Sequence, residues 1–600
     1  MELSENGIAN VYGAIMHKLL FTLAATTMLA GTAHAGATIM PLDRATILAG
    51  SPFDFKIELD TVHAEADIAV TVNGKPYAEV FGKPADFVAE EKGKDDTVLG
   101  SALILRDLVL ATPGDYAIEV KAGDESKSVT WTVFGTPGTP KAKNILFFVG
   151  DGLSVAHRTA ARIMSHGMHD GKADGRLAMD DLDRMAFIGT SSTHSIATDS
   201  ANTMSAYMTG HKARVNALGV YADRTPDTQD DPKVETIAEA LRRTTNKSIG
   251  VVSTAEIEDA TPAAVVAHTR KRADKADIVG MFYDVQPEVI LGGGSAYFLK
   301  ADIPGSKRKD DKDYIAMFRD AGYALATNAT ELSAAAGANS GKVLGLFHTG
   351  NMDSWLDRNQ LKMGTVGKFP DQPGLVAMTT TALDQLSKNP EGFFLMVEGA
   401  TIDKMSHPLD WDRAVVDTIE FDQAVAAGME FAKTHPDTLV VVTGDHTHGV
   451  SVIGTIDDDK PGEEMREKVG TYDAAGYPNY TDANGDGFPD KIDVSKRLAI
   501  FSSNFPDYYE TWRPKMDGPF EPAVKTENGT YVANEAYKDV PGAVLRIGNL
   551  PKDEDTGVHA VDDVVLQSTG PGSDAFKGYM EQSDVYKVLA DAFALGTVQK

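Results

Sequence analysis

Phe393-Phe-Leu-Met-Val-Glu-Gly-Ala-Thr-Ile-Asp-Lys404 joins an unbroken apolar run to acidic residues that follow it directly. A short apolar run of this kind favours a strand buried on both faces, as in a parallel sheet covered by helices. Similar runs occur elsewhere, and helical patterns such as 412–434 separate them. This alternation predicts an α/β fold with a mostly parallel sheet flanked by helices. The other predicted strands are 144–149, 248–253, 289–291 and 439–443.

Acidic residues and histidines follow four of these predicted strands. In open α/β sheets the ligand site lies beyond the carboxyl ends of the strands, so we expect these side chains to converge. Asp and His suit zinc, whereas Asp, Glu and Thr oxygens suit magnesium. Two such ions about 4 Å apart clamp the attacking and leaving oxygens of a phosphoryl transfer. The strand-end motifs are Gly150-Asp-Gly152, Glu398 to His407, Gly444-Asp-His-Thr-His448 and Glu256 to Thr261.

Ser200 is the candidate nucleophile, in Thr198-Asp-Ser-Ala201. Residues 202–208 predict a helix that ends at Thr209-Gly210. A serine at the start of that helix faces free N–H groups and the positive end of the dipole, which favour a phosphoryl anion. Metal coordination would also deprotonate its hydroxyl. The alternative is that Ser200 is only a helix N-cap.

The first part of the chain has a different, period-two pattern. Residues 67–72, 116–121 and 128–134 alternate in hydropathy, and Asn73-Gly74 is a tight-turn signal. We predict an all-β, immunoglobulin-like sandwich over residues 36–137. We predict that a catalytic domain over residues 138–600 follows. Within it, residues 453–550 lack the α/β pattern and are predicted to form an insertion.

Residues 1–35 resemble an export leader. Met16-His-Lys18 is basic, residues 19–29 are apolar, and Ala33-His-Ala35 matches a cleavage pattern. Met16 is an alternative start, and a short buried helix is the alternative interpretation. The pattern predicts a periplasmic or secreted protein.

The amino-acid composition disfavours some classes of partner and excludes cysteine as a metal ligand. The formal net charge is -30, which disfavours nucleic acid and anionic membrane as partners. The chain has no cysteine, so any metal site must use histidines and carboxylates.

Taken in order, these motifs resemble the alkaline phosphatase family over roughly residues 144–600, less the insertion. The resemblance implies the family's fold. It also implies the family's hydrolysis of phosphate monoesters through a phosphoserine, here at Ser200. The resemblance also favours a homodimer. The matching motifs are Asp151-Gly152, Thr198 to Ala201, Asp259-Ala-Thr-Pro262, Val397 to Lys404, Gly444-Asp-His446 and Thr556-Gly-Val-His559.

The resemblance implies two Zn²⁺ ions and one Mg²⁺ ion. Asp403, His407 and His559 would hold the first zinc. Asp151, Asp445, His446 and the Ser200 oxygen would hold the second. Magnesium would take Asp151, Thr261 and Glu398, with Asp259 reaching it through water.

The resemblance also implies the groups that bind phosphate. Arg272 would clamp two phosphate oxygens, Asp199 would orient Arg272, and Lys404 would reach phosphate through water. Arg270 and Lys271 are alternatives to Arg272 if the register of an expected helix over 264–272 shifts. His448 and His268 are expected to support other residues or to pack rather than to bind metal.

A second metal motif lies in the predicted insertion. Its acidic spacing matches an EF-hand-like calcium loop, with Gly487 at the sharp turn. The twelfth position is Asp rather than Glu, and an acidic turn without calcium is the alternative. The predicted ligands are Asp482, Asn484, Asp486, Phe488, Asp490 and Asp493.

Two other function classes remain open at this point. A phosphodiesterase or sulfatase of the same superfamily is one, although Ser200, Thr261 and Glu398 favour monoesters and the absence of cysteine disfavours most sulfatases. A calcium-dependent surface binding protein, in which the sandwich does the binding, is the other.

Overall fold

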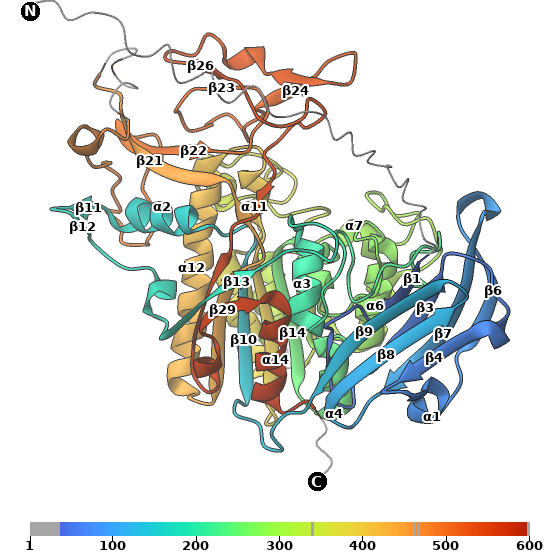
Figure 1. Cartoon of the computed structure of the whole chain (residues 1–600). Helices are drawn as coiled ribbons and strands as arrows, with labels where there is room; N and C mark the ends of the chain where they lie inside the picture. The colour runs from blue at the N-terminus through green and yellow to red at the C-terminus, as the bar shows by residue number, and fades with distance from the viewer. Residues whose placement is uncertain (1–35, 338–340, 461–463, 465–468, 597–600) are drawn as a thin grey trace, which may run out of the picture.

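The computed structural model describes residues 36–337, 341–460, 464 and 469–596. The predicted leader, including Met16, lies outside these residues. Figure 1 shows an all-β part, in blue, beside a large sheet flanked by helices. Within the described residues, every helix is too short or too polar to cross a membrane.

The large sheet has ten strands in the order β16-β17-β15-β14-β18-β10-β19-β28-β13-β29. Its outer strands are β16 (Ala324–Ala326) and β17 (Val343–Leu346) at one end and β13 (Arg184–Gly189) and β29 (Gly578–Glu581) at the other. Its pairs are parallel from β16 to β19, and β28 (Val564–Thr569) is antiparallel to both of its neighbours. The five predicted strands are confirmed. They are β10 (Asn144–Gly150), β14 (Ser248–Glu256), β15 (Val289–Gly293), β18 (Phe393–Gly399) and β19 (Thr438–Gly444), and every residue in them is buried.

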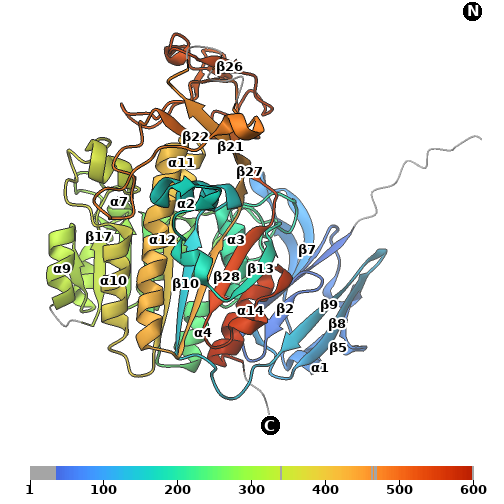
Figure 2. The ribbon, with the colours of Figure 1, turned by 90° about the vertical axis from the view of Figure 1, so that its left-hand side faces the viewer.

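Helices cover both faces of this sheet, as Figures 1 and 2 show. One apolar core lies under α2 (Val155–His166), α10 (Leu375–Leu386) and α12 (Trp411–Thr434). The other lies under α3 (Ser200–Thr209), α4 (Ile237–Thr244), α6 (Lys275–Val285) and α14 (Gln582–Phe593). Because both faces are covered, the strands are continuously apolar.

The all-β part contains two sheets around a common core. One has the order β1-β3-β7-β6 and the other β2-β9-β8-β4-β5. Their shorter strands are β1 (Ala37–Met40), β2 (Thr46–Leu48), β5 (Lys75–Pro76) and β6 (Asp86–Lys92). Asn73 and Gly74 both have positive φ, 50° and 78°, in the predicted turn after β4 (Ile68–Val72). Trp131 is fully buried between Phe53 and Phe55. The longer strands of the two sheets are β3 (Pro52–Leu59), β7 (Val98–Val109), β8 (Gly114–Ala122) and β9 (Glu125–Phe134).

The predicted insertion forms small two-stranded sheets that lie above α11 (Thr401–Ser406) in both views. The buried Arg413 of α12 joins this region to the core, because it donates to the Lys515 carbonyl at 2.8 Å and to Asp357 and Asp410. The pairs are β21 (Val450–Asp457) with β22 (Lys496–Ser502), β23 (Tyr508–Glu510) with β26 (Val544–Arg546), and β24 (Ala523–Lys525) with β25 (Tyr531–Ala533).

The expected helix over 264–272 is wrong. Helix α5 spans only Ala260–Ala263, and the chain then runs to an isolated antiparallel bridge between Thr269 and Leu218. Only residues 264–267 are apolar, and their N–H groups still donate to carbonyls of α5, whereas the polar residues that follow leave the helix. The apolar pattern does not show where the helix stops.

Candidate active site

Ser200 is the first residue of α3, and Asp199 is the cap. The Asp199 carboxylate accepts a hydrogen bond from the Asn202 N–H at 3.0 Å. The interpretation of Ser200 as the N-cap is therefore wrong. Its hydroxyl is instead free to face the ends of β10 and β19, and Ser200 is 2% exposed. Gly210, with φ of 79°, ends the helix where the sequence predicts.

Two side chains from strand ends, Asp151 and His446, meet the Ser200 hydroxyl, and Asp445 lies beside His446. Ser200 Oγ lies 3.4 Å from Asp151 Oδ1 and 3.2 Å from His446 Nε2. His446 Nε2 lies 3.2 Å from Asp151 Oδ1 and 3.4 Å from Asp445 Oδ2. A tetrahedral ion with bonds of about 2.0–2.1 Å has ligand–ligand edges of about 3.3–3.4 Å. Ser200, Asp151 and His446 therefore have the spacing of ligands around one zinc ion, and Asp445 lies within reach of the same histidine nitrogen. We call Asp151, Ser200, Asp445 and His446 the nucleophile group.

The backbone orients Asp445 in this group. Gly152 N–H and His446 N–H donate to Asp445 Oδ1 at 2.9 and 3.0 Å. Asp445 Oδ2 is buried and has no hydrogen-bond partner among the described residues. A buried carboxylate oxygen without a partner is costly, so this atom fits a cation.

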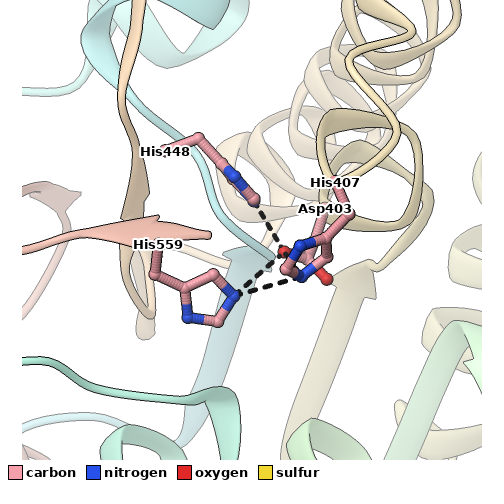
Figure 3. Close-up of side chains that lie close together, drawn as sticks. All are labelled: Asp403, His407, His448 and His559. Carbon is pink, nitrogen blue, oxygen red and sulfur yellow. Dashed lines mark hydrogen bonds and ion pairs between the residues drawn. The ribbon is translucent and has the colours of Figure 1, made fainter. Parts of the chain in front are cut away.

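A second group surrounds Asp403 on α11, as Figure 3 shows. Asp403 Oδ1 lies 3.3 Å from His407 Nε2 and 3.6 Å from His559 Nε2, and the two ring nitrogens are 3.2 Å apart. The spacing again fits one ion, so we call Asp403, His407 and His559 the Asp403 group. The His559 and His446 rings stack at 3.5 Å, which places the two groups side by side.

Backbone carbonyls set the tautomer of the two histidines in the Asp403 group. His407 Nδ1 lies 2.7 Å from the Gly557 carbonyl, and His559 Nδ1 lies 2.8 Å from the Thr198 carbonyl. With Nδ1–H donating in each ring, Nε2 presents its lone pair toward Asp403, as a metal-binding histidine requires.

His448 supports Asp403. Its Nε2 lies 2.7 Å from Asp403 Oδ1, a hydrogen-bond length that is shorter than the ligand spacings above. His448 in β20 (Thr447–His448) pairs with His559 in β27 (His559–Ala560), so one two-residue ladder positions both rings. The His446-x-His448 spacing was the available sequence signal for this contact.

We predict that His448→Ala weakens metal binding about 10–100-fold without removing a ligand, because Asp403 loses the bond that orients it. Titration of the chelated protein with zinc measures this affinity. The matched control is His435→Ala, because His435 lies at the far end of α12 and stacks on Phe431. An unchanged zinc affinity in the His448 variant would contradict this role.

The predicted magnesium ligands come from neighbouring strand ends. Glu398 of β18 pairs with Val149 of β10, and Val149 is two residues before Asp151. The Glu398 carboxylate accepts a hydrogen bond from Ser253, and the buried Thr261 hydroxyl has no partner among the described residues. Burial and the charge of Asp151 raise the pKa of Glu398 well above its usual value. A hard cation such as Mg²⁺ would satisfy the oxygens of Asp151, Thr261 and Glu398.

Two cations lie beside these carboxylates. Arg272 Nη2 lies 2.9 Å from Asp259 Oδ1 and its Nη1 lies 3.3 Å from Asp199 Oδ2. Lys404 Nζ lies 3.3 Å from Asp259 and 3.4 Å from Asp403. Burial acts to lower the pKa of Arg272 and of Lys404, but the neighbouring carboxylates outweigh it and raise both. Both groups therefore stay charged beside Ser200.

A model of the alkaline phosphatase family matches residues 142–595. The chain belongs to the alkaline phosphatase family. The resemblance seen in the motifs is thereby confirmed, and the protein is a metal-dependent phosphatase.

Named relatives agree with this family. The chain is 32% identical over 394 residues to alkaline phosphatase of Escherichia coli (strain K12), which covers 59% of this chain and 79% of that one. It is 32% identical to the tissue-nonspecific isozyme of Gallus gallus, over 76% of this chain and 85% of that one.

Solved structures share the fold. Thermus thermophilus alkaline phosphatase has a TM-score of 0.55 at 23% identity, over 77% of this chain and 93% of that one. The enzyme from the Antarctic bacterium TAB5 has a TM-score of 0.51 at 22% identity, over 76% and 98%.

The alternatives to Arg272 lie away from the strand ends of this alkaline phosphatase. Arg270 binds Asp223 and Asp231, at 2.9 and 3.0 Å, and Lys271 is largely exposed. His268 is buried and lies 2.9 Å from both the Gly219 carbonyl and Glu239, so it packs and supports other residues, as expected from the sequence.

The predicted calcium loop is folded against α12. Asp482 Oδ2 accepts from Gly487 N–H at 2.8 Å, and Asp486 Oδ1 accepts from Phe488 N–H at 2.9 Å. Phe488 stacks on Trp355 with ring centroids 3.8 Å apart. The loop thus has its turn and its anchor within the chain, and calcium binding there stays a prediction.

Proposed function

We propose that Ser200 is the nucleophile with which this alkaline phosphatase hydrolyses phosphate monoesters. Ser200 Oγ attacks phosphorus, an Oγ–P bond forms, and the ester P–O bond breaks as the alcohol leaves with a proton. Water then attacks the phosphoserine, the Oγ–P bond breaks, and inorganic phosphate is released. The position of the Ser200 hydroxyl, within 3.4 Å of Asp151 and His446, is the observation that carries this proposal.

We propose two zinc ions and one magnesium ion as the resident metals. The nucleophile group and the Asp403 group would each hold a zinc, and Asp151, Thr261 and Glu398 would hold magnesium, with Asp259 nearby. Bound divalent cations lower the pKa of a serine hydroxyl and offset the charge of phosphate and of the leaving oxygen. The buried oxygens of Asp445 and Thr261 that lack partners support this assignment.

The cationic side of the site would bind the phosphate oxygens. Arg272 presents a planar fork that suits two oxygens, and its contact with Asp199 orients it. The N-terminus of α3 adds backbone N–H groups and a favourable dipole. Lys404 lies one residue from Asp403 and adds a further positive charge. Together these groups offset the repulsion of an anionic substrate by a chain of net charge -30.

The proposal is tested with an aryl phosphate monoester and the matching diester, each with and without a chelator. We expect preference for the monoester, loss of activity on chelation, and recovery when zinc and magnesium are restored. Preference for the diester would favour the phosphodiesterase alternative, and full activity after complete metal removal would reject the metal assignment.

We also propose a structural calcium ion in the loop that contains Asp482, Asn484, Asp486, Phe488, Asp490 and Asp493. Added calcium is expected to raise the Tm, because binding to the folded loop stabilises it. Asp482→Ala should abolish this increment, whereas Asp473→Ala, at an exposed acid outside the loop, should keep it. A Tm in the parent protein that calcium does not change would remove the assignment.

Export and assembly remain proposals. The leader pattern at residues 1–35 supports a periplasmic or secreted location. The family resemblance supports a homodimer, and β13 (Arg184–Gly189) and β29 (Gly578–Glu581) present the exposed apolar side chains Met185, Phe187 and Tyr579 at the end of the large sheet.

A further inference from the structure

The segment between α3 and α4 lies against the sandwich. Tyr221 and Val234 of this segment are buried in the sandwich core, beside Phe53. Val234 forms a bridge with Phe53, and Asp54 N–H donates to the Lys233 carbonyl at 2.8 Å. The segment 218–235, called the interface loop below, is therefore packed into the N-terminal part although it belongs to the catalytic sequence.

Buried charges reinforce this contact. Lys56 of β3 lies 2.6 Å from Asp223 of the interface loop and 2.6 Å from Glu91. Lys56 also contacts Glu58 at 3.1 Å. Glu58, Glu91 and Asp223 have the spacing of metal ligands, but the Lys56 ammonium already occupies the space among them. The group is thus a buried ionic link and not a metal site.

Asp223 continues the link toward the active site. Its Oδ2 accepts from Lys56, and its Oδ1 accepts from Arg270 Nη1 at 2.9 Å. Arg270 also donates to Asp231 Oδ1 at 3.0 Å and to the Thr225 and Asp227 carbonyls. One carboxylate therefore joins a cation of the sandwich to a cation two residues before Arg272.

The backbone carries the link to Arg272. Thr269 and Leu218 exchange both backbone hydrogen bonds, at 2.9 and 2.8 Å, and Arg272 N–H donates to the Asn216 carbonyl at 2.9 Å. Asn216 N–H in turn donates to Asp199 Oδ2, the oxygen that contacts Arg272 Nη1. The segment that carries Arg272 is thus hydrogen-bonded to the chain that leads into the interface loop.

We propose that Asp223 is a positioning residue, through which the sandwich holds Arg272 in place for phosphate binding. The inference rests on the proposed role of Arg272. The helical hydrogen bonds that continue α5 end at Ala267, so the position of residues 268–272 depends on these partners. A misplacement of about 1 Å in a positioning group costs up to about 100-fold in rate, so a firm anchor matters.

The test compares the full-length variants Asp223→Asn and Glu125→Gln. Glu125 is also buried, and its hydrogen bonds within the part of the chain that the structure describes go to Asp60, Thr61 and His63 of the sandwich. We expect Asp223→Asn to raise the inhibition constant of inorganic phosphate and the KM of an aryl phosphate about 10-fold. Glu125→Gln should change both less than twofold, even where the two variants lose similar Tm.

Arg272→Ala and the double variant with Asp223→Asn separate this inference from the proposed function. If Asp223 acts through Arg272, Asp223→Asn adds nothing to the phosphate inhibition constant in the Arg272→Ala background. Additive effects, or equal effects of Asp223→Asn and Glu125→Gln, would overturn the inference. An unchanged constant in Asp223→Asn beside a raised one in Arg272→Ala would also overturn it.

An unchanged constant in Arg272→Ala itself would reject the proposed role of Arg272 and, with it, this inference. Arg270→Lys cuts the same link from the catalytic side and keeps the charge, so it provides the same test if Asp223→Asn does not fold.

Discussion

Ser200→Ala is expected to lower kcat for an aryl phosphate monoester by about 10³-fold or more while leaving the fold unchanged. The change removes the only atom that forms the proposed covalent bond. Alanine is a good helix former at the start of α3, and Asp199 still caps the helix. Acid-quenched protein should carry phosphate on Ser200 in the parent enzyme and none in the variant, as measured by mass spectrometry.

A second buried serine controls for the loss of a hydroxyl. Ser165 lies in α2, and among the described residues its hydroxyl donates to carbonyls of its own helix, at 2.7 Å to Ala161 and 3.5 Å to Arg162. Ser165→Ala should retain nearly full kcat and the phosphate label. A Ser200→Ala enzyme that still turned over at a large fraction of the parent rate would exclude Ser200 as the nucleophile.

Asp445→Asn is expected to lower kcat/KM more than about 100-fold, because substitutions that only support a ligand already cost about 10–100-fold. Asp445 Oδ2 is a buried oxygen beside His446 that has no hydrogen-bond partner among the described residues, whereas Oδ1 keeps its backbone donors when the residue is asparagine. The chelated variant should therefore unfold at the same or a higher temperature than the chelated parent, because one buried negative charge is gone.

The metal-loaded variant should lose the Tm increment that zinc gives the parent. Thermal unfolding with and without chelator measures both effects. Asp422→Asn is the matched control, because Asp422 is a buried carboxylate that accepts from Ala178 and Met179 N–H, at 2.8 and 2.9 Å, outside the site. Its Tm should fall equally in both conditions. A chelated Asp445→Asn protein that is strongly destabilised would show that this carboxylate stabilises the fold without metal.

Much of the site was predictable because its residues follow strands that are easy to recognise. Glu398 comes directly after a continuous apolar run, and Asp151 and Asp445 follow theirs within three residues. The ends of β10, β18 and β19 meet at one edge of the sheet. His559 was harder to predict from its local sequence, because its strand β27 has only two residues and no hydrophobic pattern. Its role came from the family motif, and its place beside His446 came from the structure.

Residues 264–272 show the limit of pattern reading. A helix was expected over 264–272, yet the helical hydrogen bonds end at Ala267, and the chain then pairs through Thr269 with the distant Leu218. Which of Arg270, Lys271 and Arg272 faces the site follows from that pairing. Partners that are far apart in sequence decide it, and no local periodicity records them.

The sequence alone determined the α/β class, the sandwich-like pattern before it, and the set of ligand types, because these depend on local periodicity and on chemistry at strand ends. Only the tertiary structure decided which arginine lies beside Asp199 and Asp259, that His448 supports Asp403, and that Asp223 joins the sandwich to the segment of Arg272. These are contacts across long sequence separations, and their distances depend on how the whole chain packs.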